Sequence, residues 1–328
     1  MTASTGMTFQ AARITPGEAR DVWSASTEAS AFTCPANLEL IAAEVDWWGV
    51  RRGNRLIAAW PLIRQQRGGD IGPPPFTYYV GPLFLSDIRV NMCSARAWNA
   101  YTGSFRAMVE AVTGAHASFS FSLPLGLMDV RVLSWWNFDH PGEKGFEITP
   151  RYSARIDLAR HPDEASLLKG MSGDRRRAIA QWSMSPPAES GRVPVERIIE
   201  LHDQTLRRTG GQITPGRHVA LRRMIALAQS GAGTITGYHP DGSEAAEAAV
   251  IVVDGAGTAN NIFSSTSDAH ARSGLSSWVT WQAIRRAHAR GLRWFDMNGA
   301  NSPNRAANKH SYGAGAELYF DCRFSRNP

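Results

Sequence analysis

One order of secondary structure occurs twice in the chain, and this repeat constrains the fold more than any other feature. The second half predicts strands over 233–238, 248–253 and 258–264, a helix over 278–290 and a closing strand over 294–297. The first half predicts strands over 45–51, 56–63 and 76–84, a helix over 98–112 and a strand over 118–123. Turn residues such as Pro240-Asp241-Gly242 separate the strands. The repeat predicts an α+β fold with two tandem domains, each a mixed, mostly antiparallel sheet flanked by helices. Two unrelated α+β domains are the alternative.

The length and composition agree with two globular domains. A chain of 328 residues suits two domains of about 150 residues each. We place them at 1–145 and 146–328. The apolar fraction of 43% and the charged fraction of 20% are ordinary for a globular protein. No stretch reaches the roughly 18 apolar residues of a membrane helix, and the first residues lack the features of a secretory signal, so we expect a cytoplasmic protein.

The cysteines and histidines do not predict a metal centre. Cys34, Cys93 and Cys322 are far apart, which indicates reduced thiols, and the nine histidines lack metal-ligand spacing. We therefore expect no metal and no cofactor. The net charge of +6 favours a polyanionic partner such as tRNA or a CoA-type donor, although many basic proteins have no such partner. Only three of the 35 Lys and Arg residues are lysine, which draws attention to Lys309.

The last forty residues carry the most specific pattern. Gly291-Leu292-Arg293-Trp294-Phe295-Asp296-Met297-Asn298-Gly299 is followed by Asn308-Lys309-His310-Ser311-Tyr312-Gly313. With the strand 146–158 and the basic helix 172–181, it resembles the second domain of FemAB-like transferases, a tandem branch of the GNAT acyltransferase superfamily. The N-terminal half matches in outline only. The resemblance implies an enzyme that moves an acyl or aminoacyl group onto an amine. No sustained heptad is present for the coiled-coil arm of peptidoglycan-building members, which leaves the acceptor open.

Lys309 and Asp296 are the catalytic candidates. The family motif falls on Lys309, whose ammonium would stabilise negative charge at the donor phosphate or ester; the alternative is a surface lysine in a turn. Asp296 ends a strand that is buried on both sides. It either orients the amine and accepts its proton through water, or caps the following turn through backbone N–H groups.

Six further residues are candidates for binding the donor or the acceptor. Arg175 and Arg176 lie near the start of a helix, where a phosphate would be bound well; a solvated basic face is the alternative. Asn298 and Asn301 belong to a polar loop after a strand end, and such residues also form ordinary turns. Tyr312 stacks on a nucleobase or fills the core. Trp136 lies in the expected connection between the domains, where a pocket would use it.

The favoured reaction is direct attack on an aminoacyl ester. The chain has no Gly-x-Ser-x-Gly elbow and no cysteine in a catalytic motif, so an acyl-enzyme is not predicted. The pyrophosphate-binding turn of acetyl-CoA-dependent enzymes is reduced to Gly274 within Ala269–Ser276. We therefore predict an aminoacyl-tRNA donor and a small-molecule amine acceptor. The alternatives are an acyl-CoA or acyl-carrier-dependent N-acyltransferase, and a non-catalytic tandem GNAT-like binding protein.

Overall fold

The computed structural model describes residues 8–66, 69–89, 94–140 and 142–326, which form two compact units. The first unit is Met1–Arg151 with Leu318–Pro328, and the second is Tyr152–Glu317. The expected domains 1–145 and 146–328 remain a prediction. The compact units differ from them mainly in the last segment, which returns to the first unit because its strand pairs there. No helix among the described residues is both long and apolar enough to cross a membrane.

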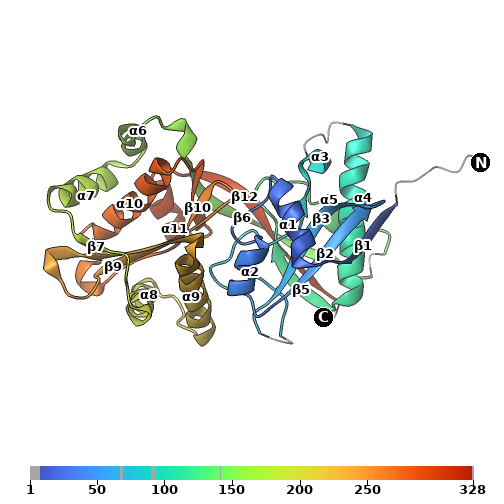
Figure 1. The fold of residues 1–328 in the computed structure, drawn as a ribbon, viewed down its shortest axis with the longest axis horizontal. Helices are drawn as coiled ribbons and strands as arrows, with labels where there is room; N and C mark the ends of the chain where they lie inside the picture. Colours follow the sequence, from blue (N-terminus) through green and yellow to red (C-terminus); the bar gives the residue numbers. More distant parts are fainter. Residues whose placement is uncertain (1–7, 67–68, 90–93, 141, 327–328) are drawn as a thin grey trace, which may run out of the picture. The chain divides into compact units, whose positions relative to one another are not determined.

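The first unit is built on a four-stranded antiparallel sheet with the order β1-β2-β3-β4. Its elements are β1 (Phe9–Arg13), α1 (Pro16–Ala25), α2 (Pro35–Ile41), β2 (Glu44–Arg52), β3 (Arg55–Arg64), β4 (Leu83–Phe84), α3 (Ser86–Arg89), α4 (Ala95–Ala115), β5 (Ser118–Ser122) and α5 (Arg131–Ser134) (Figure 1). The helix α4 packs along β1 and β2. Its Phe105 contacts Trp60 of β3 edge to face, with ring centroids 6.4 Å apart. This aromatic core explains why the unit is rich in tryptophan.

One predicted strand of the first unit is wrong. Only Leu83 and Phe84 of the expected strand 76–84 form β4. Phe76 and Tyr79 have φ angles of 67° and 58°, which an extended strand cannot accommodate. The three prolines at 73–75 precede this segment and remove backbone donors, so it folds as an irregular loop.

Two long strands, β6 (Phe146–Asp157) and β12 (Gly315–Ser325), contribute to both units. In the first unit the last five residues of β12 pair with β5, from Asp321↔Ser122 to Ser325↔Ser118. The second unit contains η1 (Leu158–Arg160), α6 (Glu164–Lys169), α7 (Gly173–Met184), β7 (Ala188–Ser190), α8 (Val195–Thr209), α9 (Pro215–Leu227), η2 (Ala228–Ala232), β8 (Gly233–His239), η3 (Pro240–Gly242), β9 (Ala248–Gly255), β10 (Thr258–Thr266), η4 (Asp268–His270), α10 (Leu275–Ala289), β11 (Trp294–Gly299) and α11 (Pro303–His310).

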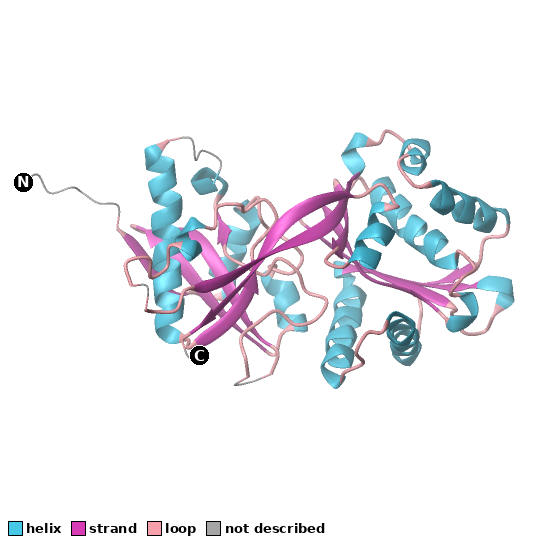
Figure 2. Cartoon of the chain, turned by 180° about the vertical axis from the view of Figure 1, so that it is seen from behind, coloured by secondary structure: helices cyan, strands magenta, loops and turns pink. Residues whose placement is uncertain are grey.

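The sheet of the second unit has the order β12-β6-β11-β10-β9-β8-β7. Figure 1 shows α7 and α10 on one face of this sheet and α8 and α9 on the other, and Figure 2 shows the same layers from behind. The apolar stripe of α10, which includes Trp278, Trp281 and Ile284, is buried against the sheet. The predicted mixed α+β fold with sheets flanked by helices is confirmed.

Candidate active site

The candidate site lies where two central strands of the second unit separate. The parallel strands β10 and β11 pair over three positions only, ending at Asn260↔Asp296. Beyond this point β10 continues to Thr266 and β11 to Gly299. The register of β10 against β9 also shifts between Asn261 and Phe263, so Ile262 has no opposite residue. A bulge beside a strand separation frees backbone groups from the ladder, and such places are common next to active sites.

Asp296 stands at the last paired position and is fully buried. Its Oδ1 accepts hydrogen bonds from Ser153 Oγ at 2.6 Å and from the N–H of Asn298 at 2.7 Å. Its Oδ2 lies 3.5 Å from Arg155 Nε, and Arg155 also pairs with Glu317 at 2.6 Å. A buried carboxylate needs such partners to stay charged. These contacts are to the protein's own groups, and they fix the irregular end of β11, where the register against β6 shifts between Asp296 and Gly299.

Asn298 lies within this irregular end of β11 and is in the left-handed region, with a φ of 60°. Asparagine tolerates this conformation better than most residues. Its Nδ2 donates to the carbonyl oxygen of Asn261 at 2.8 Å, so the side chain reaches from β11 to β10 where the strands part. Because Nδ2 must face that carbonyl, Oδ1 is fixed as the free acceptor. Oδ1 is buried and has no hydrogen-bond partner among the described residues.

The side chain of Lys309, on α11, contacts the same end of β11. Its Nζ donates to the carbonyl oxygens of Asn298 at 3.0 Å and of Gly299 at 2.7 Å. Burial lowers the pKa of Lys309 from 10.5 to about 8; the charge of Asp296 acts in the opposite direction and that of Arg305 in the same one. Two of the three N–H groups of the ammonium make these bonds, which leaves one N–H for a ligand. The structure thus brings Lys309, Asp296 and Asn298 together at the end of β11.

Arg175 and Tyr312 contact each other next to the end of α11. The guanidinium of Arg175 lies 4.6 Å from the ring centroid of Tyr312. It also donates from Nε to Ser311 Oγ at 2.8 Å and from Nη1 to Ser277 Oγ at 2.7 Å. Arg175 therefore ties the start of α7 to α10 and to the turn after α11. Tyr312 is buried, which favours the prediction that this residue fills the core.

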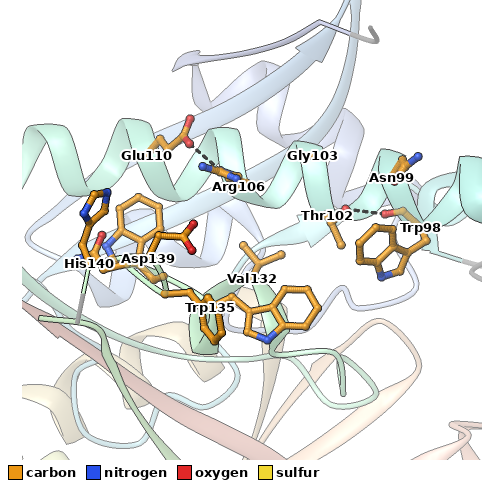
Figure 3. Close-up of a pocket in the computed structure, with 13 residues that line it drawn as sticks. Trp98, Asn99, Thr102, Gly103, Arg106, Glu110, Val132, Trp135, Asp139 and His140 are labelled. Atoms are coloured by element: carbon orange, nitrogen blue, oxygen red, sulfur yellow. Dashed lines mark hydrogen bonds and ion pairs between the residues drawn. The ribbon is translucent and has the colours of Figure 1, made fainter. Parts of the chain in front are cut away.

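The other predicted binding residues lie apart from this group. Arg176 is exposed on α7 and donates to the carbonyl oxygens of Lys169 and Met171. Asn301 is exposed, and its Oδ1 accepts the N–H of Tyr152 at 2.7 Å. Trp136 belongs to the first unit, where it lines a cavity of about 490 Å³. Figure 3 shows this cavity, with Trp98 and Arg106 on α4 and Trp135 directly after α5.

The start of α10 differs from a typical pyrophosphate site. Gly274 caps the helix with a φ of 79°, and the backbone N–H of Leu275 donates to Ser273 Oγ at 3.2 Å. The carbonyl oxygen of Ser273 in turn accepts a hydrogen bond from Trp182 Nε1 at 2.9 Å. One backbone donor that would hold a phosphate is therefore used within the chain.

The sequence reading missed several residues of this site. Ser153, Arg155, Asn261, Ser277 and Ser311 each contact a predicted site residue. Arg155 had only a weak signal, because it stands between the apolar residues Ala154 and Ile156 of a strand that carries other charges. The serines and Asn261 had none, because their neighbours come from distant positions in the chain.

Comparisons with known proteins agree with this fold. Residues 172–305 match the family model of the acetyltransferase (GNAT) domain. FemX has a similar structure, with a TM-score of 0.63 and 10% identity, over 95% of this chain and 96% of that one. A tandem GNAT protein from the clavulanic acid biosynthesis pathway gives a TM-score of 0.56 at 14% identity, over 98% and 99%. L-PGS from Bacillus licheniformis gives 0.55 at 11% identity, over 96% and 93%. At these identities the likeness shows a shared fold. No curated protein matches the chain.

Proposed function

We propose that this chain, an acyltransferase with a GNAT domain and the tandem fold of FemX, forms amides from aminoacyl-tRNA. The amine of a small-molecule acceptor attacks the ester carbonyl directly. A C–N bond forms, the C–O bond to the terminal ribose breaks, and the ribose hydroxyl leaves with a proton. The amine's excess proton passes to water or to the substrates.

The observation that carries this proposal is the position of Lys309. Its Nζ is fixed by the carbonyl oxygens of Asn298 and Gly299, beside the point where β10 and β11 separate. An ester carbonyl in this separation would develop negative charge during attack. A half-buried ammonium with one free N–H stabilises such charge far more strongly than a solvated one. The bulge at Ile262 supplies a candidate backbone donor for the same oxyanion.

Direct transfer fits the nucleophiles that this unit offers. The two cysteines among the described residues, Cys34 and Cys322, belong to the first unit. Ser153 is fully buried and donates to a carboxylate instead of to a histidine, so it lacks the base that activates a serine. We therefore propose transfer without an acyl-enzyme, with neither the described cysteines nor Ser153 as an attachment point.

The choice of tRNA over CoA rests on two features. The net charge of +6 suits a polyanionic donor. At the start of α10, the backbone N–H of Leu275 already donates to Ser273 Oγ, so this group is not available to the pyrophosphate of CoA. We propose that the exposed Arg176 binds the donor phosphates, and that Arg175, Tyr312 and Asn301 support the site through their contacts within the chain. Trp136 is proposed to bind a ligand only within the first unit.

A transfer assay tests this function. Purified protein is incubated with a tRNA-free pool of cellular amines and either radiolabelled aminoacyl-tRNA or acyl-CoA, and amide products are separated. We expect label to enter an amide from aminoacyl-tRNA only. Amide formed from acyl-CoA alone would support the CoA-dependent alternative. Tight donor binding without any product would support a binding protein.

A further inference from the structure

A cluster of two histidines and an aspartate lies between α8 and α9 and takes no part in the proposed transfer. His202 and Asp203 are neighbours on α8, and His218 lies in the first turns of α9. The Oδ1 of Asp203 is 3.0 Å from His202 Nδ1 and 2.8 Å from His218 Nε2. The three ligand atoms lie within 4.8 Å of one another, and no other such group occurs in the described ranges.

The helices bring these residues together for simple reasons. His202 follows Ile198 and Leu201 on the buried face of α8 and is only 5% exposed. Gly210 ends α8 in the left-handed conformation, and Thr214 with Pro215 starts α9. This short connection returns the chain, so the first turns of α9 face the middle of α8.

We propose that His202, Asp203 and His218 form a zinc-binding site. Two imidazoles and one carboxylate are ligands that Zn²⁺ prefers, and three protein ligands leave a fourth position for water or another group. Ligand atoms about 2.1 Å from one tetrahedral ion lie about 3.4 Å apart, so the atoms of the cluster, now within 4.8 Å of one another, must approach by up to about 1.4 Å through side-chain rotation. The proton on each ligating nitrogen moves to the other nitrogen of the same ring.

Burial and charge affect the titration of the cluster. Burial lowers the pKa of His202. Burial raises the pKa of Asp203, but hydrogen bonds from His218 and His202 outweigh this effect, and the pKa lies below its ordinary value. Arg217 is the cation whose charge acts on His202, and it opposes a bound metal. A charge-removing substitution at Arg217 should therefore strengthen binding.

The position of the cluster gives the ion a structural consequence. The His202 ring lies 6.4 Å from that of Phe263, which follows the bulge of β10. Thr205, one turn along α8, lies 2.9 Å from Ser265 of β10, hydroxyl to hydroxyl. A zinc ion would cross-link α8 to α9 and hold both beside the strand that carries the candidate oxyanion donor. The proposal does not depend on which acyl donor is used.

Zinc titration of the tag-free, chelator-treated full chain tests the proposal. Equilibrium dialysis with elemental analysis should give one Zn²⁺ per chain. His218→Gln and Asp203→Asn should each weaken binding by at least about 100-fold, as loss of a ligand requires. The control His140→Gln removes an exposed histidine of the first unit and should leave binding unchanged. Arg217→Gln should bind more tightly.

Two further readouts keep the test decisive. His218→Glu places a carboxylate at similar reach, and it should bind zinc and become more thermostable when zinc is added. Co²⁺ bound to the wild-type chain should show the visible absorption of a low-symmetry site. Absence of stoichiometric binding by the wild type, or undiminished binding by folded His218→Gln and Asp203→Asn, would overturn the proposal and leave a hydrogen-bonded cluster only.

Discussion

Lys309 donates to the main-chain carbonyl oxygen of Asn298 at 3.0 Å, and Asn298 is held in a left-handed conformation with a φ of 60°. The side chain of Asn298 in turn bonds the backbone of β10. Lys309, the left-handed residue Asn298 and the separating strands are therefore connected. A substitution at any of them should change the positions of the others.

Loss of the Lys309 ammonium should reduce catalysis without unfolding the protein. We expect Lys309→Met to lower the turnover number by about 10²–10³-fold, the cost of removing one oxyanion-stabilising donor. Lys169→Met is the matched control, since Lys169 is exposed on α6. Steady-state kinetics with saturating donor would show the difference. Equal activities of the two variants would contradict a catalytic role for Lys309.

The same lysine should make stability depend on pH. Its pKa is about 8 in the folded protein and 10.5 ordinarily, so the unfolded chain binds more protons between these values. Stability contributed by this group therefore rises as pH increases through that window. In urea denaturation from about pH 7 to about pH 10, the free energy of unfolding of the wild type should rise relative to that of Lys309→Met. A constant difference between the two proteins across that range would contradict the lowered pKa.

Asp296 should be required for folding as well as for the site. Asp296→Asn leaves Arg155 buried beside an amide, and breaking a buried ion pair costs about 3–5 kcal/mol. Glu317→Gln is the control because it removes the other, more exposed partner of Arg155, worth at most about 1 kcal/mol. The free energy of unfolding measured in urea compares them. Similar losses in both variants would argue against the central position of Asp296.

Arg175 and its neighbour Arg176 should behave differently. Arg175→Lys loses the planar fork that joins Ser277, Ser311 and the Tyr312 ring, at a cost of about 2 kcal/mol in stability. Arg176→Ala should leave stability within about 0.5 kcal/mol, because its side chain is exposed. Thermal denaturation distinguishes the two. If Arg176→Ala proved the more destabilising, the assignment of Arg175 as the connecting residue would be wrong.

Much of the second unit could be predicted from sequence. The expected strand 248–253 is β9 from Ala248 to Gly255, and the expected helix 278–290 is α10 from Leu275 to Ala289. Apolar periodicity and turn residues determine such elements locally. The sequence predicts a polar loop and a turn where the structure has helix α11, because Pro303–His310 contains few apolar residues. Its Pro at the first position after Ser302 was the available signal.

The geometry of the site could be predicted only in part. The motif singled out Asp296, Asn298 and Lys309, but it did not predict their mutual contacts, the Arg155 pair or the bond from Asn298 to Asn261. Those contacts join positions far apart in the chain. The His202, Asp203 and His218 cluster was missed for the same reason, since its third member lies on a separate helix. Trp136 was proposed as a pocket residue only because of its position between the predicted domains. That position carries no information on what surrounds its side chain.

The most direct test of the central claim is binding of the purified full chain to a charged total-tRNA pool, the same pool deacylated, and acetyl-CoA. All three are measured at one fixed salt concentration, because phosphate-driven affinity falls steeply with salt. We predict tighter binding of charged than of deacylated tRNA, with the preference reduced in Lys309→Met. Equal affinity for the two tRNA pools together with saturable acetyl-CoA binding would contradict the aminoacyl-tRNA donor.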